Sequence, residues 1–274
     1  MKLYISCDME GVAGVCAWQQ VEARNSHPEY AVYRRYYTQE VKAAVAGARA
    51  AGVTEFLVND SHGPMRNLDL EAFDSDVRVI FGNRKPFSMV QGADAGFAGA
   101  FFVGYHGGAG DADAVLCHTY TPAVIYEVRL NGMRCSEATL NAALLGYYGV
   151  PLLMVTGDRT TVEGVRRQMP WVRGAIVKES IGNFAANTML PGSACELIRA
   201  AAAEAVRDVP RAELFRVEPP VTLDVDLVTA AQAHLVAMIP GFERVGSRSV
   251  RFVHDDYAVV FKSFVATWRL GGQA

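Results

Sequence analysis

Residues 3–10, LYISCDME, form a short apolar segment that ends in two acidic side chains, Asp8 and Glu10. Apolar residues at helical spacing follow over residues 30–51, and the apolar segment 55–58 then indicates a second strand. A strand, a helix and a strand in this order usually place the two strands parallel, because the helix carries the chain back to the starting edge. The opening of the chain therefore predicts an α/β fold.

The same alternation continues through the first two thirds of the chain. Further strands are predicted over residues 77–81, 99–104, 124–130, 152–155 and 175–178. Helices are predicted over residues 137–148, from residue 158 or 160 onward, and over residues 191–207, with capping or helix-breaking residues at their boundaries. We expect a mostly parallel sheet flanked by helices.

The last quarter of the chain has a different pattern. Residues 208–220 contain three prolines and mixed charges, which is typical of a linker. After it we expect strands over residues 221–227 and 245–254, and helices over residues 227–238 and 256–269. The predicted organisation is an α/β domain over residues 1–207 and a smaller α+β lobe over residues 208–274.

Composition excludes several classes of protein. The 274 residues are 51% hydrophobic and 20% charged, unlike a disordered chain, and the net charge of −3 argues against a nucleic-acid partner. The longest apolar run, residues 95–105, is about half of the roughly 20 residues that a membrane helix needs. The N-terminus does not resemble a signal peptide, and the five scattered cysteines indicate reduced thiols. We expect a cytoplasmic protein without a membrane partner.

Side chains that can bind metals follow the predicted strands. Ligands of open α/β sheets bind beyond the carboxyl ends of the strands. Asp8 and Glu10 follow the first strand, His62 the second and His106 a later one, while Glu137 opens a helix. Imidazole with carboxylate suits zinc, manganese or iron, and five ligands exceed the three of a usual catalytic zinc. The set therefore favours a two-metal site.

Two more residues complete the candidate site. His118 is left over as an acid, a base or an oxyanion-stabilising group, and Asn141 lies one helical turn after Glu137 as a candidate donor to substrate. Each of these side chains alone could equally be a helix cap, a turn residue or a hydrogen-bonded structural histidine. The metal hypothesis depends on all of these positions together, because each of them carries a side chain that can bind metal.

The residues also resemble a known family. The segments DMEG at residues 8–11, NDSH at residues 59–62 and GYH at residues 104–106 occur in this order, with KPFSMV at residues 85–90 between them. These blocks are similar to those of the M55 peptidases, the zinc-dependent D-aminopeptidases. The resemblance is close over residues 1–190 and looser beyond.

The resemblance implies a metal site and an assembly. Its five metal ligands correspond to Asp8, Glu10, His62, His106 and Glu137. Its catalytic histidine corresponds to His118, although the Gly/Ala-rich segment between His106 and His118 differs in length by a residue. The family further implies a cytoplasmic ring-like homo-oligomer, a decamer in the enzyme that typifies it.

The functional hypothesis is a binuclear zinc aminopeptidase with its catalytic domain in residues 1–207. It would hydrolyse the N-terminal residue, a D-amino acid, from short peptides or amino-acid amides, with Asp8 as the bridging carboxylate. One alternative is a metal-dependent amidase for another small amide. Others are a non-catalytic metal- or dipeptide-binding protein, and a flavodoxin-like domain that binds a nucleotide.

Overall fold

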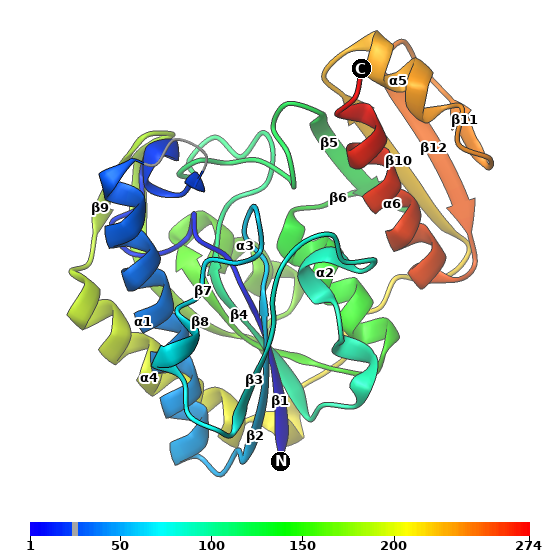
Figure 1. The fold of residues 1–274 in the computed structure, drawn as a ribbon. Coiled ribbons are helices and arrows are strands. Elements are labelled where there is room, and N and C mark those ends of the chain that lie inside the picture. Colours follow the sequence, from blue (N-terminus) through cyan, green and yellow to red (C-terminus); the bar gives the residue numbers. More distant parts are fainter. Residues whose placement is uncertain (24–26) are drawn as a thin grey trace.

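The computed structural model describes residues 1–23 and 27–274. Over these residues the strands form a seven-stranded sheet and a separate five-stranded sheet. Figure 1 shows the larger sheet within an α/β domain and the smaller one in a lobe to its side. The predicted α/β fold with a mostly parallel sheet and a C-terminal α+β lobe is confirmed.

The larger sheet has the strand order β3-β2-β1-β4-β7-β8-β9. Its strands are β1 (Lys2–Cys7), β2 (Glu55–Asp60), β3 (Val77–Ile80), β4 (Gly99–Tyr105), β7 (Leu152–Asp158), β8 (Arg173–Gly182) and β9 (Ala185–Thr188). All neighbours are parallel except β8 and β9. The chain leaves β1 toward β2 and β3 and then returns to its other side at β4. The carboxyl ends of β1 and β4 therefore mark the switch point at which such sheets bind ligands.

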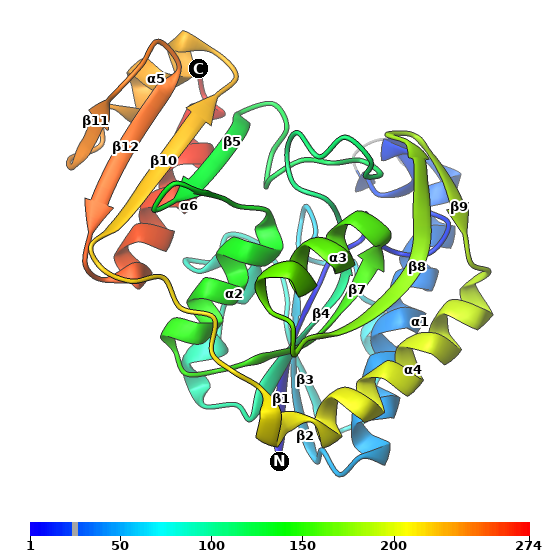
Figure 2. The same ribbon diagram turned by 180° about the vertical axis from the view of Figure 1, so that it is seen from behind.

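Helices cover both faces of this sheet (Figure 2). The long α1 (Pro28–Ala50) and α4 (Pro191–Arg207) pack together on one face, and α2 (Glu137–Tyr147) and α3 (Arg159–Gln168) lie on the other. β1 alternates accordingly, since Leu3 and Ile5 join the core under α1 while Tyr4 joins the opposite core. None of the helices in the described part of the chain is long and apolar enough to cross a lipid bilayer.

The lobe is built from two distant parts of the chain. Its sheet has the order β11-β12-β10-β5-β6. The strands are β5 (Ile125–Leu130), β6 (Met133–Arg134), β10 (Val221–Leu227), β11 (Phe242–Arg244) and β12 (Ser249–His254), with α5 (Ala230–Val236) and α6 (Tyr257–Gly271). The division after residue 207 stays a prediction, and the sheet of the lobe takes two strands from before that boundary.

Two local predictions were wrong. Residues 245–254 form no single strand, because the turn through Gly246 and Ser247 separates β11 from β12. The predicted strand 175–178 extends to Gly182 and turns back as β9, an antiparallel hairpin that apolar periodicity did not reveal. The hairpin has no apolar periodicity because it buries no continuous face, and Ile181 and Phe184 at its tip are exposed.

Candidate metal centre

Six side chains meet at the carboxyl ends of β1, β2 and β4. Three are carboxylates and three are imidazoles: Asp8, Glu10, His62, His106, His118 and Glu137. Asp8 and Glu10 follow β1, and His62 and His106 follow β2 and β4. Glu137 is the first residue of α2, whose Ser136 side chain accepts a hydrogen bond from the backbone N–H of Thr139.

One half of the cluster is centred on His62. Its Nδ1 lies 3.1 Å from Asp8 Oδ1 and 2.9 Å from Glu10 Oε2. Asp8 turns its other oxygen toward His106, with 3.4 Å between Oδ2 and Nε2. One carboxylate thus lies between two imidazoles, the arrangement expected of a bridging ligand.

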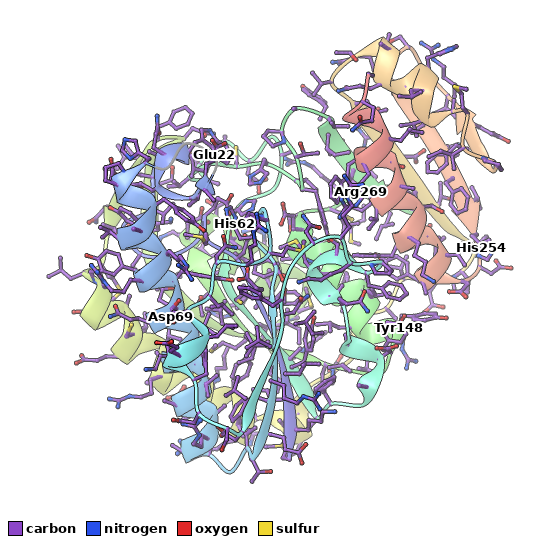
Figure 3. All side chains as sticks on the ribbon, viewed as in Figure 1. Glu22, His62, Asp69, Tyr148, His254 and Arg269 are labelled. Carbon is purple, nitrogen blue, oxygen red and sulfur yellow. The ribbon has the colours of Figure 1, made fainter. Side chains whose placement is uncertain are left out.

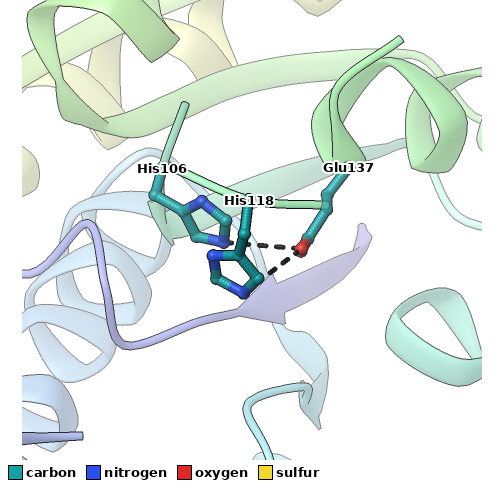
Figure 4. A group of neighbouring side chains, drawn as sticks. All are labelled: His106, His118 and Glu137. Carbon is teal, nitrogen blue, oxygen red and sulfur yellow. Dashed lines mark ion pairs between the residues drawn. The ribbon is translucent and has the colours of Figure 1, made fainter. Parts of the chain in front are cut away.

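The other half is centred on Glu137. Its Oε1 lies 3.5 Å from His106 Nε2 and 3.8 Å from His118 Nε2 (Figure 4). His118 Nε2 is in turn 4.0 Å from Glu10 Oε1. Carboxylates and imidazoles therefore alternate around a closed ring, which we call the six-residue ring.

Backbone carbonyls fix the orientation of all three imidazoles. The Nδ1 atoms of His106 and His118 donate to the carbonyls of Gly107 (2.9 Å) and Leu116 (2.8 Å), and His62 donates from Nε2 to Val21 (2.8 Å). These bonds leave Nε2 of His106 and His118 and Nδ1 of His62 facing the ring. Such anchoring of the outer nitrogen is typical of metal-binding histidines.

The charge of the ring requires compensation. Asp8, Glu10 and Glu137 are each at most 3% exposed. Within residues 1–23 and 27–274, no lysine or arginine lies within ion-pair distance of these three carboxylates. His106 Nε2 is buried without a hydrogen-bond partner among the same residues. Buried anions and an orphaned imidazole nitrogen fit divalent cations.

The ring shifts the pKa values of its members in different directions. Burial lowers the pKa of His62 and His106, but the neighbouring carboxylates together outweigh it, chiefly Glu10 with Asp8 at His62 and Glu137 with Asp8 at His106. Both pKa values therefore lie well above the usual range. Burial also acts to raise the pKa of Asp8, and hydrogen bonds from His106 and His62 reverse this effect. Burial and the neighbouring His106 lower the pKa of His118.

Two glycines let β1 and β4 bring their ends together. A side chain on Gly11 would overlap the carbonyl oxygen of Tyr105, and one on Gly104 would overlap that of Asp8. Gly104 also has φ +73°, which suits glycine, and its carbonyl accepts a hydrogen bond from Gly11 at 2.8 Å. This close approach places Glu10 beside the loop that carries His106.

A buried lysine holds the loop after β1, and sequence reasoning missed it. Lys178 of β8 is 2% exposed and donates to the carbonyls of Glu10 (2.5 Å), Val12 (3.0 Å) and Val15 (2.7 Å). Glu40 of α1 accepts from the N–H of Ala13 in the same loop at 2.8 Å. A lysine directly after the apolar run of residues 175–177 was the sequence feature that could have indicated it.

Asn141 lies beneath the ring. Its amide nitrogen donates to the hydroxyl of Tyr105 at 3.1 Å, and its oxygen accepts from the hydroxyl of Tyr120 at 2.8 Å. The backbone N–H of Tyr120 donates to Glu137. Tyr120 therefore connects Asn141 to the six-residue ring by hydrogen bonds. Its contact with substrate stays a prediction.

Fold and site together define a class: an α/β metalloprotein with a buried carboxylate–histidine centre at the switch point of its sheet. The family model of the M55 peptidases, described as D-aminopeptidase, matches residues 1–266. The chain belongs to this family, and it is a hydrolase that acts on peptide bonds.

A sequence match and a structural match support the assignment. A D-aminopeptidase of Bacillus subtilis (strain 168) is 33% identical over 274 residues, which cover 98% of this chain and 97% of the relative. The solved structure of the Zn-dependent D-aminopeptidase DppA from Bacillus subtilis, described as a self-compartmentalizing protease, has a TM-score of 0.95 and 32% identity. The structural match covers 100% of this chain and 99% of the DppA chain.

Proposed function

We propose that this chain is a binuclear zinc aminopeptidase. It removes the N-terminal residue, a D-amino acid, from short peptides or amino-acid amides. The observation that carries this proposal is the six-residue ring, whose three buried carboxylates have only imidazoles as ion-pair partners in the described chain. The zinc dependence and D-specificity named for the relatives support it.

Five residues would hold two zinc ions: Asp8, Glu10, His62, His106 and Glu137. Asp8 is the proposed bridging ligand, because its two oxygens face different histidines. Bound zinc supplies Lewis-acid chemistry, which activates water as a nucleophile and polarises the scissile carbonyl. Zinc is preferred over calcium or magnesium because two of the five proposed ligands are imidazoles.

His118 is the proposed catalytic residue. Its Nδ1–H donates to the carbonyl of Leu116, so its Nε2 faces the ring. Nε2 can take up a proton as a base, and once protonated it can stabilise the oxyanion or donate that proton to the leaving amine. The Trp18 ring packs against the His118 ring in a T-shaped contact, with 5.3 Å between ring centroids. Asn141 is the proposed substrate contact, although its bonds to Tyr105 and Tyr120 also suit a positioning role.

We further propose a cytoplasmic homo-oligomer, a decamer by family resemblance, without nucleic-acid or membrane partners. The description of the DppA structure as self-compartmentalizing supports an assembly of this kind.

The test combines metal content with stereospecific cleavage. We expect about two zinc ions per chain, and chelator-sensitive hydrolysis of D-alanine p-nitroanilide but not of its L-isomer. Asp8→Asn should lose both metal and turnover, whereas the exposed Asp255→Asn serves as the matched control. Two ions with no cleavage of either anilide would favour the amidase alternative, and absence of metal uptake would refute the centre.

A further inference from the structure

A pair of arginines lies where α6 of the lobe meets the loop after β3, and this loop is hydrogen-bonded to the residue after His62. Arg269 is a partly buried residue near the end of α6, and its Nη2 donates to Asn83 Oδ1 at 3.1 Å. Arg84 follows Asn83 in the loop after β3. The lobe and the α/β domain therefore each contribute one guanidinium group to the same place.

Arg269 is connected to both sides of the six-residue ring. Asn83 Nδ2 donates to the carbonyl of Gly63 at 3.1 Å, directly after His62. On the other side, the ring of Trp268 lies 5.8 Å from that of Tyr120, whose backbone N–H donates to Glu137. Figure 3 shows Arg269 on the flank of α6 toward His62.

Several hydrogen-bond donors around Arg269 lack an anionic acceptor. Among the described residues, no carboxylate forms an ion pair with Arg84 or Arg269, whereas Arg251 of the same lobe pairs with Asp224 at 2.7 Å. The indole N–H of Trp268 is also buried without an acceptor among those residues. Burial and the nearby Arg84 charge lower the pKa of Arg269, whose guanidinium lies over the Trp268 ring, 4.3 Å from its centroid.

We propose that Arg269, assisted by Arg84, binds the C-terminal carboxylate of a short peptide substrate. The proposal rests on the aminopeptidase function proposed above. A guanidinium presents two N–H groups in the geometry of a carboxylate, which makes arginine the usual receptor for this group. Among the substrates proposed above, free-acid peptides of a few residues are then preferred over amides and long chains.

The test compares D-alanyl-D-alanine with its C-terminal amide on the zinc-loaded enzyme. We expect kcat/KM for the acid to exceed that for the amide by about 10- to 100-fold, the size of a charge-assisted hydrogen bond. Arg269→Gln should remove this preference by weakening cleavage of the acid only, with zinc content unchanged. Arg84→Gln should do so partly, and Arg269→Lys should restore part of it. Arg251→Gln removes a positive charge from the same lobe and serves as the control.

Equal kcat/KM for acid and amide in the wild type would overturn the proposal, as would an equal loss for both in Arg269→Gln. Cleavage of neither compound would instead refute the aminopeptidase function. In that case both compounds are titrated calorimetrically into the zinc-loaded protein. Tighter binding of the acid that Arg269→Gln abolishes would support the carboxylate site, and equal affinities would refute it.

Discussion

His106 and His118 stack face to face, with 4.1 Å between ring centroids and 4° between ring planes. Both direct Nε2 toward the same oxygen of Glu137, at 3.5 and 3.8 Å. The two rings therefore share one carboxylate, and of these two histidines only His106 also lies near Asp8, at 3.4 Å. The second carboxylate of His118 is Glu10, at the longer distance of 4.0 Å, so His118 is the more loosely held of the two histidines.

His118→Ala should retain both zinc ions and lose turnover. A group that stabilises the oxyanion or transfers a proton typically contributes about 10²- to 10⁴-fold in rate. The measurement is kcat for D-alanine p-nitroanilide together with zinc content by atomic absorption. The exposed His234→Ala is the control. Loss of one zinc ion per chain would identify His118 as a ligand instead.

Removal of the metal should destabilise the fold. Without cations, three buried carboxylates repel one another across the ring, and ligand binding at about 1,000 times Kd contributes about 4 kcal/mol. For a chain of this size that corresponds to a fall in Tm of about 10 °C. Calorimetry before and after chelation measures it, and added zinc should restore the original Tm. An unchanged Tm after complete chelation would contradict a buried metal centre.

Gly11→Ala should disrupt the metal centre. The new methyl group would overlap the carbonyl of Tyr105, so the ends of β1 and β4 would have to separate and carry Glu10 away from His106. We expect a loss of about 1–3 kcal/mol in stability, as for overpacking, and weaker zinc binding. Gly192→Ala, where nothing lies within 4 Å, should be neutral in both measurements. Tight zinc binding by Gly11→Ala would show that the metal centre does not require the close approach of β1 and β4.

Glu40→Gln should change the pH dependence of stability. Burial raises the pKa of Glu40 to about 7, against 4.5 for an ordinary glutamate. The folded protein therefore retains a proton that the unfolded chain has lost, and stability falls by about 3 kcal/mol between pH 4.5 and 7. Glutamine does not titrate, so the variant should not lose this stability. Its free energy of unfolding, relative to that of the wild type, should rise by the same amount between pH 4.5 and 7.

Denaturant unfolding of both proteins at pH 5 and pH 8 measures the difference. Other titrating groups cancel in the comparison because both proteins carry them. A constant difference between the two proteins over this range would show that Glu40 does not titrate there.

Local patterns predicted most of the fold. The segment at residues 3–10 combined an apolar strand with acidic residues at its end, and these features follow from nearest-neighbour chemistry and the two-residue period of a strand. The same reasoning found the ends of β2 and β4, and with them His62 and His106. Because carboxyl ends of parallel strands meet at one edge, these residues could be grouped without coordinates.

By itself the sequence determined the α/β alternation, the set of candidate ligands and the family. Only the tertiary structure decided that β5 joins β10, that Lys178 holds the loop after β1, and that Arg269 of the lobe lies beside Asn83. These contacts join residues separated by many positions, from 93 between the paired Leu130 and Leu223 to 186 between Asn83 and Arg269. Periodicity and capping report only on near neighbours, whereas such contacts depend on how whole elements pack.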